Sequence, residues 1–160
     1  MNPALPFGLG YILGRKGWVK NKFLKDSIYV VETNIDDMNP VIYETVIEKL
    51  YKTGALEVFL VPVQMKKIRP GILLTVLIPK DKLKKIAEIL LKETTSFGIR
   101  YYEVKRLKLI RKKSADNSGH DKIGMNIGYM GRELVKISPE YRDCRRIASK
   151  RNTPLKNIIW

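Results

Sequence analysis

The sequence is poor in the side chains that bind soft metal ions. Its 160 residues include one histidine, His120, and one cysteine, Cys144. One of each is too few for a zinc or nickel site built from nitrogen and sulfur ligands within one chain. A lone cysteine also forms no internal disulfide, and no base that would make it a nucleophile stands nearby. We interpret His120 as a solvated loop residue and Cys144 as a core residue.

Long apolar runs are also absent. The densest, Gly71–Pro79 (GILLTVLIP), is far shorter than the roughly 18 residues of a membrane span and is typical of a buried strand. No N-terminal segment has the charged, then apolar, then small-residue pattern of a secretory signal. We therefore expect a cytoplasmic protein with no membrane partner. The glycine motifs of the common nucleotide-binding helix N-termini are missing as well.

Acidic side chains are scarce relative to basic ones. The chain has 16 Asp and Glu against 31 Lys and Arg, a net charge of +15, which indicates an anionic partner such as a nucleotide phosphate, nucleic acid or an acidic membrane surface. Residues 28–99 are nearly balanced, with 10 basic and 9 acidic side chains, whereas residues 100–151 carry 15 and 6. The positive excess therefore belongs to the N-terminal lead and the C-terminal third.

The first two thirds of the chain predict a ferredoxin-like domain. Asn39 is a capping residue, Pro40 suits a first helical position, and Gly54 stops the helix between them. The predicted elements are a strand at 27–33, this helix, strands at 56–65 and 72–78, a helix from Asp81 to near Gly98 and a strand at 99–111. The buried face of the second helix would contain Leu83, Ile86, Ala87, Leu90 and Leu91. A bulge is predicted in the last strand between Val104 and Leu107. This order of strands and helices is the split βαβ arrangement.

The remaining third predicts a smaller subdomain. We expect a polar loop at 114–120, a β-hairpin from strands 123–129 and 133–137, and a final helix capped by Ser138 with Pro139 first. Tyr141, Cys144, Ile147 and Ala148 would form its buried face. The fold class is therefore α+β, with an extended arm at 1–26, the ferredoxin-like domain at 27–112 and a small α+β subdomain at 113–160.

The turn at Gln64–Gly71 (QMKKIRPG) is the most unusual segment. Lys66, Lys67 and Arg69 crowd a connection between two apolar strands, where a bound polyanion would remove their repulsion. A merely solvated turn is the alternative.

Other basic side chains stand close to aromatic ones. Arg100 precedes Tyr101 and Tyr102 in a pattern compatible with phosphate contact and base stacking, although tyrosines more often pack on a sheet. Arg145 is placed to reach inward from the last helix.

Two adjacent carboxylates, Asp36 and Asp37, follow the first predicted strand and precede a helix. Carboxylate oxygens there would suit Mg²⁺ or Mn²⁺. Acidic residues at a helix start also favour the helix dipole and accept hydrogen bonds from backbone N–H groups, so both interpretations stay open.

Four longer segments are specific to one known family. They are ETNIDDMNP at 32–40, GALEVFLVPVQMKKIRPG at 54–71, ETTSFGIRYYEVKR at 93–106 and PEYRDCRRIA at 139–148. In this order they resemble the C-terminal region of the LarC nickel insertion proteins. The resemblance implies a CTP-dependent chelatase of the lyase class that inserts nickel into pyridinium-3,5-bisthiocarboxylic acid mononucleotide, giving the nickel-pincer cofactor used by lactate racemase.

The resemblance also implies binding of CTP with a divalent cation, Mn²⁺ or Mg²⁺. Lys66, Lys67, Arg69, Arg100 and Arg145 then become candidates for the triphosphate, and Asp36 and Asp37 for the cation. The larger N-terminal region of the family is not in the matched part, and 114–130 departs from the family's strand pattern, so we expect full activity to need that region as a partner.

We also expect a homo-oligomer with a ligand pocket near an interface. Two other classes of function stay open: a non-catalytic module that binds single-stranded RNA on its sheet, and a regulatory nucleotide-sensing domain. Nucleic acid is the less favoured partner because the first strand offers only Tyr29 as an aromatic side chain.

Overall fold

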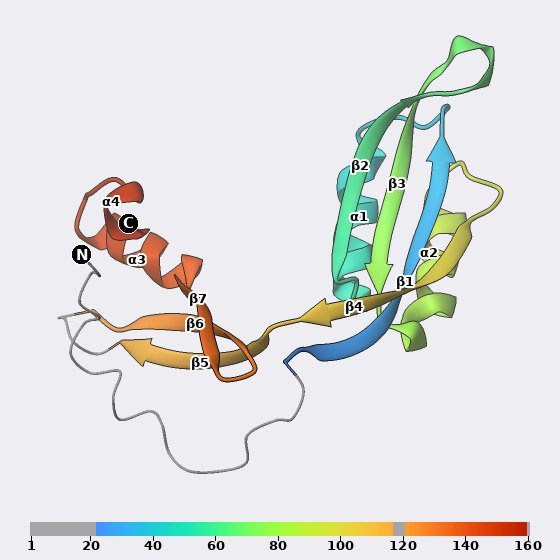
Figure 1. Ribbon diagram of the computed structural model, residues 1–160. Helices are drawn as coiled ribbons and strands as arrows, with labels where there is room; N and C mark the ends of the chain where they lie inside the picture. The colour runs from blue at the N-terminus through green and yellow to red at the C-terminus, as the bar shows by residue number, and fades with distance from the viewer. Residues whose placement is uncertain (1–21, 117–120, 160) are drawn as a thin grey trace. The chain divides into compact units, whose positions relative to one another are not determined.

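The computed structural model describes residues 22–116 and 121–159 (Figure 1). Most of the arm expected at 1–26, and the loop residue His120, lie outside these ranges. The described chain divides into two compact units, one formed by residues 25–107 and the other by residues 22–24, 108–116 and 121–159.

The helices and strands follow in one order along the chain. They are β1 (Leu24–Ile35), α1 (Ile42–Thr53), β2 (Glu57–Gln64), the 3₁₀ turn η2 (Lys66–Ile68), β3 (Pro70–Ile78), the 3₁₀ turn η3 (Lys80–Lys82), α2 (Leu83–Glu93), β4 (Arg100–Lys108), β5 (Ile110–Asp116), β6 (Ile123–Met130), β7 (Glu133–Pro139), α3 (Tyr141–Lys150) and α4 (Lys156–Ile159). None of the helices in the described residues is long and apolar enough to cross a membrane.

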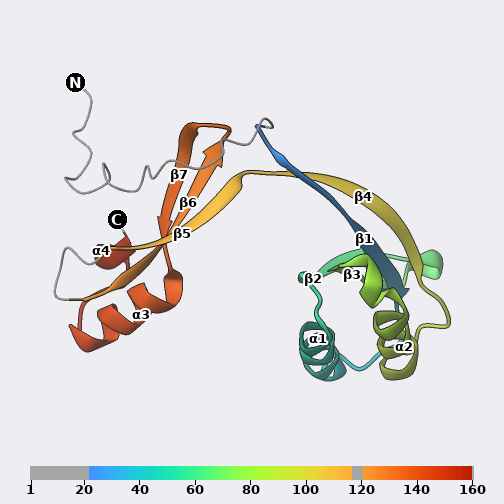
Figure 2. The same ribbon diagram turned by 90° about the horizontal axis from the view of Figure 1, so that it is seen from below.

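The unit of residues 25–107 is ferredoxin-like, as predicted. Its four strands lie in the order β2-β3-β1-β4, and α1 and α2 cover the same face of this sheet, as Figure 2 shows from below. The register pairs Val31 with Val76 and Thr33 with Leu74, which places the alternate apolar side chains of neighbouring strands on one face. The prediction of an α+β fold is confirmed.

Helix α1 ends at Gly54 as predicted but begins later than predicted, because Val41 and not Asn39 directly precedes its first residue, Ile42. The Asn39 carboxamide oxygen accepts a hydrogen bond from the Val41 N–H at 3.1 Å, and the regular helix starts at Ile42. Gly54 ends it with φ at 106°, a left-handed conformation that favours glycine because it has no Cβ.

The core of this unit lies between the sheet and the two helices. Its buried members are Val31, Ile35, Met38, Tyr43, Val46, Leu50, Leu74, Val76, Ile78, Ile86 and Leu90. Leu91, predicted to be buried, is 44% exposed, because successive residues of a helix point about 100° apart and Leu90 occupies the buried position.

The second unit contains a three-stranded sheet in the order β5-β6-β7, not the two-stranded hairpin that we predicted. Strand β5 takes residues 110 and 111, which we had assigned to the fourth strand, and residues 114–116, which we had assigned to a loop. Its sequence, IRKKSAD, has too few apolar residues to show a strand pattern. Pairing with β6 along the whole of β5 makes it one.

The last helix also starts later than predicted. Pro139 ends β7, Glu140 precedes the helix, and Ser138 lies in the strand instead of capping. Cys144 and Ile147 are buried as expected, but Tyr141 is 59% exposed. Among the described residues, no element at the first turn of α3 covers the Tyr141 ring.

Candidate functional site

One end of the four-stranded sheet gathers three connections. Neighbouring strands run antiparallel, so β1 and β2 end where β3 and β4 begin. The connections 36–41, 65–69 and 94–99 therefore meet at this end, which we call the loop end (Figure 1). Of the predicted site residues, it holds Asp36, Asp37, Lys66, Lys67, Arg69 and Arg100.

The β2–β3 turn has a strained backbone. Lys67 and Ile68 have φ values of 58° and 57°, and the Met65 N–H closes the turn by donating to the Arg69 carbonyl oxygen at 2.8 Å. A β-branched residue rarely adopts a positive φ, and such residues cost about 1–3 kcal/mol. The Ile68 side chain is 85% exposed, so its own burial does not offset this cost.

Gly71 sets the turn close against the end of β1. A Cβ atom at this position would lie 2.8 Å from the backbone oxygen of Ile35 and 2.5 Å from the sulfur of Met65. Both distances are too short for any side chain, so glycine is required here. From the turn, Arg69 reaches Asp36 of the β1–α1 connection. In the part of the chain that the structure describes, neither Lys66 nor Lys67 forms an ion pair.

Two arginines of the loop end have partners of very different strength. The Arg69 Nη1 atom lies 3.5 Å from Asp36 Oδ2, and this exposed pair is a weak one. Arg100 donates from Nε to Glu32 Oε2 at 2.9 Å and from Nη1 to Asn34 Oδ1 at 2.6 Å. Arg69 can therefore leave its partner at little cost, whereas Arg100 is held against β1.

Hydroxyl groups tie the α2–β4 connection to β1. The Thr33 and Ser96 hydroxyls lie within hydrogen-bond distance of each other and of the Gly98 carbonyl oxygen, 2.9 and 2.8 Å away, so their two protons serve these three contacts in turn. Thr95 donates to Asp37 Oδ1. Burial raises the pKa of Tyr43, and the negative charge of Asp37 raises it further. The Asp37 carboxylate is thus oriented by a side chain from another connection.

Arg145, the remaining predicted site residue, belongs to the other unit. It lines a shallow cavity of about 520 Å³ together with Ala148, Ser149, Asn152, Thr153, Pro154 and Leu155. The fold of the 25–107 unit therefore assembles the loop-end residues without Arg145.

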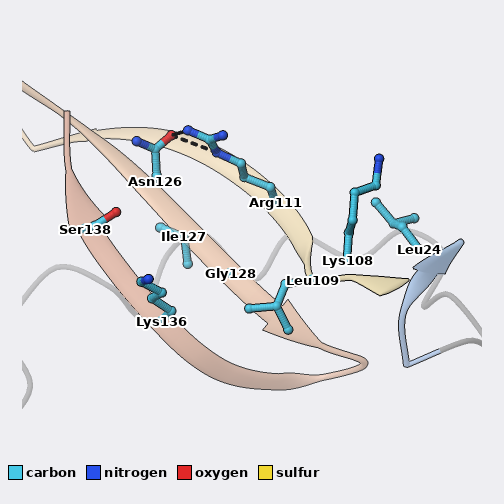
Figure 3. A pocket seen from close by; sticks show the side chains of 9 residues that line it. All are labelled: Leu24, Lys108, Leu109, Arg111, Asn126, Ile127, Gly128, Lys136 and Ser138. Atoms are coloured by element: carbon cyan, nitrogen blue, oxygen red, sulfur yellow. Dashed lines mark hydrogen bonds between the residues drawn. The ribbon is translucent and has the colours of Figure 1, made fainter. Parts of the chain in front are cut away.

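A larger cavity, of about 630 Å³, was not predicted from the sequence. It lies on the β5-β6-β7 sheet and is lined by Leu24, Lys108, Leu109, Arg111, Asn126, Ile127, Gly128, Lys136 and Ser138 (Figure 3). Its one signal in the sequence was Gly128 inside a strand, because a glycine there often marks a place where a ligand or another backbone segment approaches the strand closely.

The sequence model of one family, described as nickel insertion protein, matches residues 9–159. The chain belongs to the nickel insertion protein family. A pyridinium-3,5-bisthiocarboxylic acid mononucleotide nickel insertion protein of Thermotoga petrophila is 38% identical over 145 residues, covering 91% of this chain and 36% of that protein. Its namesake from Clostridium acetobutylicum is 44% identical over 130 residues, covering 81% and 31%. The chain thus spans about a third of the length of these relatives.

Two solved structures share the fold of this nickel insertion family member. One is LarC2, described as the C-terminal domain of a cyclometallase involved in the synthesis of the NPN cofactor of lactate racemase, in its apo form. It is 29% identical, with a TM-score of 0.79 over 85% of this chain and 94% of that one. The other, a Methanopyrus kandleri AV19 protein, is 20% identical with a TM-score of 0.66 over 84% and 85%, which shows the fold alone.

The described residues of this nickel insertion family member contain no group of three or more His, Cys, Asp or Glu side chains that would hold a metal ion. Cys144 is buried, and its pKa is raised by burial first and by Asp143 second, so its thiol is not a ready ligand at neutral pH. Asp36 and Asp37 offer carboxylate oxygens alone. That donor set fits Mg²⁺ or Mn²⁺, which keep several waters and take further oxygens from phosphates.

The aromatic side chains do not favour stacking of RNA bases on the open face of the sheet. Tyr29 packs against the helix-covered core, and the Tyr101 ring meets it edge-on with centroids 5.3 Å apart. The alternate residues of β1 and β3 that face away from the helices include no aromatic side chain. A single-stranded RNA platform needs such rings on its central strands.

Proposed function

We propose that this chain is the nucleotide-binding part of a nickel chelatase, which holds CTP with Mn²⁺ or Mg²⁺ while nickel is inserted into pyridinium-3,5-bisthiocarboxylic acid mononucleotide. The observation that carries the proposal is the meeting of cationic and carboxylate side chains at the loop end, in a chain of this family. The cations suit a triphosphate, and the carboxylates suit its divalent counter-ion.

The side chains of the loop end divide the work by how firmly they are held. Lys66 and Lys67, which have no ion pair in the described residues, contact the phosphates first as flexible point charges. Arg69 exchanges its weak 3.5 Å pair with Asp36 for a phosphate oxygen, which leaves that carboxylate and Asp37 to hold the divalent cation. The bound cation neutralises phosphate charge.

Arg100 and Arg145 have different places in this proposal. Arg100, oriented by Glu32 and Asn34, lies at the border of the site and fixes the end of β1 beside the phosphates. Arg145, in the other unit, stays a candidate for a phosphate contact of its own. Nickel is the inserted metal, and its ligands come from the N-terminal region that the curated relatives have in addition. The reaction takes place in the cytoplasm, in a homo-oligomer.

Calorimetric titration tests the nucleotide. With Mn²⁺ present, CTP should bind at least tenfold more tightly than ATP, GTP or UTP, which corresponds to about 1.4 kcal/mol. Equal affinity for the four nucleotides would contradict the proposal.

A matched pair of double variants tests the place. Lys66→Gln with Lys67→Gln should weaken CTP binding about tenfold or more, because two phosphate contacts are lost. Lys84→Gln with Lys85→Gln removes the same charge from exposed positions of α2 and should leave the affinity within about twofold. Equal losses in the two would place the site elsewhere.

The whole reaction needs a separate measurement. We expect nickel insertion only when the N-terminal region of a curated relative is added to this chain, with the nickel-containing product followed by mass spectrometry. Sedimentation of the chain with and without CTP measures the oligomeric state. Product formed by the chain alone would refute the need for the N-terminal region.

A further inference from the structure

The cavity on the β5-β6-β7 sheet is far from neutral. Lys108, Arg111 and Lys136 line it, with no carboxylate among the lining residues (Figure 3). All of its lining residues belong to the same compact unit, which is not the unit of the loop end. At about 630 Å³ it falls within the 300–1,000 Å³ range of small-molecule sites.

The strand register explains why the cations gather there. Arg111 lies opposite Gly128, and Gly128 lies opposite Lys136, so these three positions form a row across the sheet. Asn126 and Ser138 form the next row on the same face, because side chains two residues apart along a strand point the same way. Each of the three strands therefore contributes a polar side chain to a single face.

Gly128 makes the hollow between the two cations. A Cβ atom on it would lie 2.9 Å from Leu109 Cδ1 and 3.6 Å from Lys136 Cβ. Any larger residue would push Leu109 aside and fill the space. Leu24 and Leu109 line the same cavity with apolar atoms. An apolar surface bordered by cations suits a flat ring that carries an anionic group.

Arg111 is oriented before any ligand arrives. It donates from Nε and Nη2 to Asn126 Oδ1, at 3.0 and 2.6 Å, as the dashed lines in Figure 3 show. The other end of the same amide is held because Asn126 Nδ2 donates to Glu140 Oε2 at 2.5 Å. These bonds use two of the five N–H donors of the guanidinium and fix its plane. A preoriented arginine loses less side-chain entropy on binding an anion.

Lys136 differs from Arg111 in being a flexible partner. It stands across Gly128 on β7, is exposed, and forms no ion pair with a described residue. One fixed guanidinium and one mobile ammonium on either side of a hollow are a common arrangement for holding a phosphate group.

We propose that this cavity binds a mononucleotide, with its phosphate between Arg111 and Lys136 and its flat ring on Leu109 and the Gly128 backbone. It is a second ligand site, separate from the loop end, and the choice of a mononucleotide rests on the proposed function. Two molecules of that function carry a ring and a phosphate, namely CTP and the pyridinium mononucleotide.

The test uses the full 160-residue chain and two stable probes, CTP and nicotinate mononucleotide. The latter is a pyridinium carboxylate with a ribose phosphate. Titration calorimetry gives the affinity of each for the unchanged protein and for Arg111→Gln with Lys136→Gln. We expect the double variant to bind one of the probes at least tenfold more weakly. The probe that is weakened identifies the occupant.

The matched control is Lys122→Gln with Lys156→Gln, which removes the same charge from exposed positions of the same unit and should change both affinities less than twofold. Lys136→Gln alone retains the Arg111–Asn126 bonds, so we expect it to fold normally. A threefold or greater loss of affinity for the probe in this variant would therefore come from the lost ammonium group. Unchanged affinity for both probes in the double variant, or an equal loss in the control, overturns the proposal.

Failure of the two proposals can be told apart. If CTP binding depends on Lys66 and Lys67 but not on Arg111 and Lys136, the loop end is supported as the CTP site. The cavity proposal then depends on the titration with nicotinate mononucleotide. Nicotinate mononucleotide binding that depends on the cavity, with no selectivity for CTP anywhere, supports the cavity alone. Inorganic phosphate, added as a competitor, should displace either occupant if the phosphate contact contributes most of the affinity.

Discussion

The two compact units differ in what their residues do. Residues 25–107 build a continuous core between a four-stranded sheet and two helices, and their 14 basic side chains are nearly matched by 11 acidic ones. Residues 108–160 carry 13 basic and 5 acidic side chains. Their buried apolar residues are Ile127, Cys144, Ile147 and Ala148 among those described. The first unit is built mainly on burial, whereas the second keeps more of its chain for charged surface.

Arginines of the two units also show two different ways in which a positive charge is held. In the 25–107 unit, cations such as Arg100 and Arg106 are held by carboxylates of β1, and Arg106 binds Asp26 through Nε and Nη2 at 2.9 and 2.7 Å. In the other unit, Asp121 likewise holds Lys150 and Arg151, but Arg111 is held by a neutral amide, so its charge is not cancelled by its direct partner. A charge oriented without being neutralised is better suited to bind an anion.

The largest expected loss of stability follows a substitution in the core of the 25–107 unit. Leu50→Ala removes a fully buried side chain of α1 and should lower the free energy of unfolding by about 3 kcal/mol, through lost burial and the cavity left behind. Urea unfolding measures it. Leu91→Ala, at a position that is 44% exposed, is the control and should cost less than about 1 kcal/mol. Equal costs would contradict the assignment of the core.

A smaller loss is expected in the second unit. Ile147→Ala should lower the free energy of unfolding by about 2 kcal/mol, at the low end of the range for such changes, because few buried neighbours surround it and the site can relax. Amide hydrogen exchange in β5–β7 and α3 reports the loss. The control is Val135→Ala, at a position 48% exposed on β7. A cost above that of Leu50→Ala would reverse the comparison between the units.

A gain in stability is expected at the loop end. Ile68→Asn should raise the free energy of unfolding by about 1 kcal/mol, because asparagine tolerates a positive φ and the exposed isoleucine loses no packing. A chain of this length should then melt about 2–4 °C higher in calorimetry. Val41→Asn, at an exposed position with φ at −59°, should bring no gain. A lower melting temperature for Ile68→Asn would show that the turn is not strained.

The smallest effect concerns pH and the second unit. Asp121 accepts hydrogen bonds from Lys150 and Arg151, and these, in that order, lower its pKa below the ordinary value of 3.8. The folded state therefore holds this proton less tightly than the unfolded state. The stabilisation is complete above about pH 5 and is lost as the pH falls through the lowered pKa.

Acid unfolding followed by circular dichroism checks this sign. Asp121→Asn should be less stable than the unchanged chain at neutral pH, and the two should converge in acid. Asp81→Asn, which alters an exposed carboxylate of the other unit, should lie close to the unchanged chain throughout. A difference that stays constant as the pH falls through the acid range would mean that Asp121 acts through something other than its charge.

Much of the site could be predicted because its signals are local. The clustered cations of Gln64–Gly71 and the paired aspartates each stand out within a few residues. Their meeting at one sheet end follows from the predicted strand order, which was correct. The cavity could not be predicted in this way, because Arg111, Gly128 and Lys136 are far apart in sequence and meet only through the register of a strand that carries no apolar pattern.

The sequence by itself determined the ferredoxin-like order of elements, the end of α1 at Gly54, the positive charge of the C-terminal third and the family. Each rests on local propensity, on hydrophobic periodicity or on direct similarity of residues. Only the tertiary structure decided that IRKKSAD is a strand, that Arg100 is held by β1, and that Gly128 opens a hollow between two cations. These depend on which distant segment pairs with which, and backbone pairing between strands does not require a distinctive side-chain pattern.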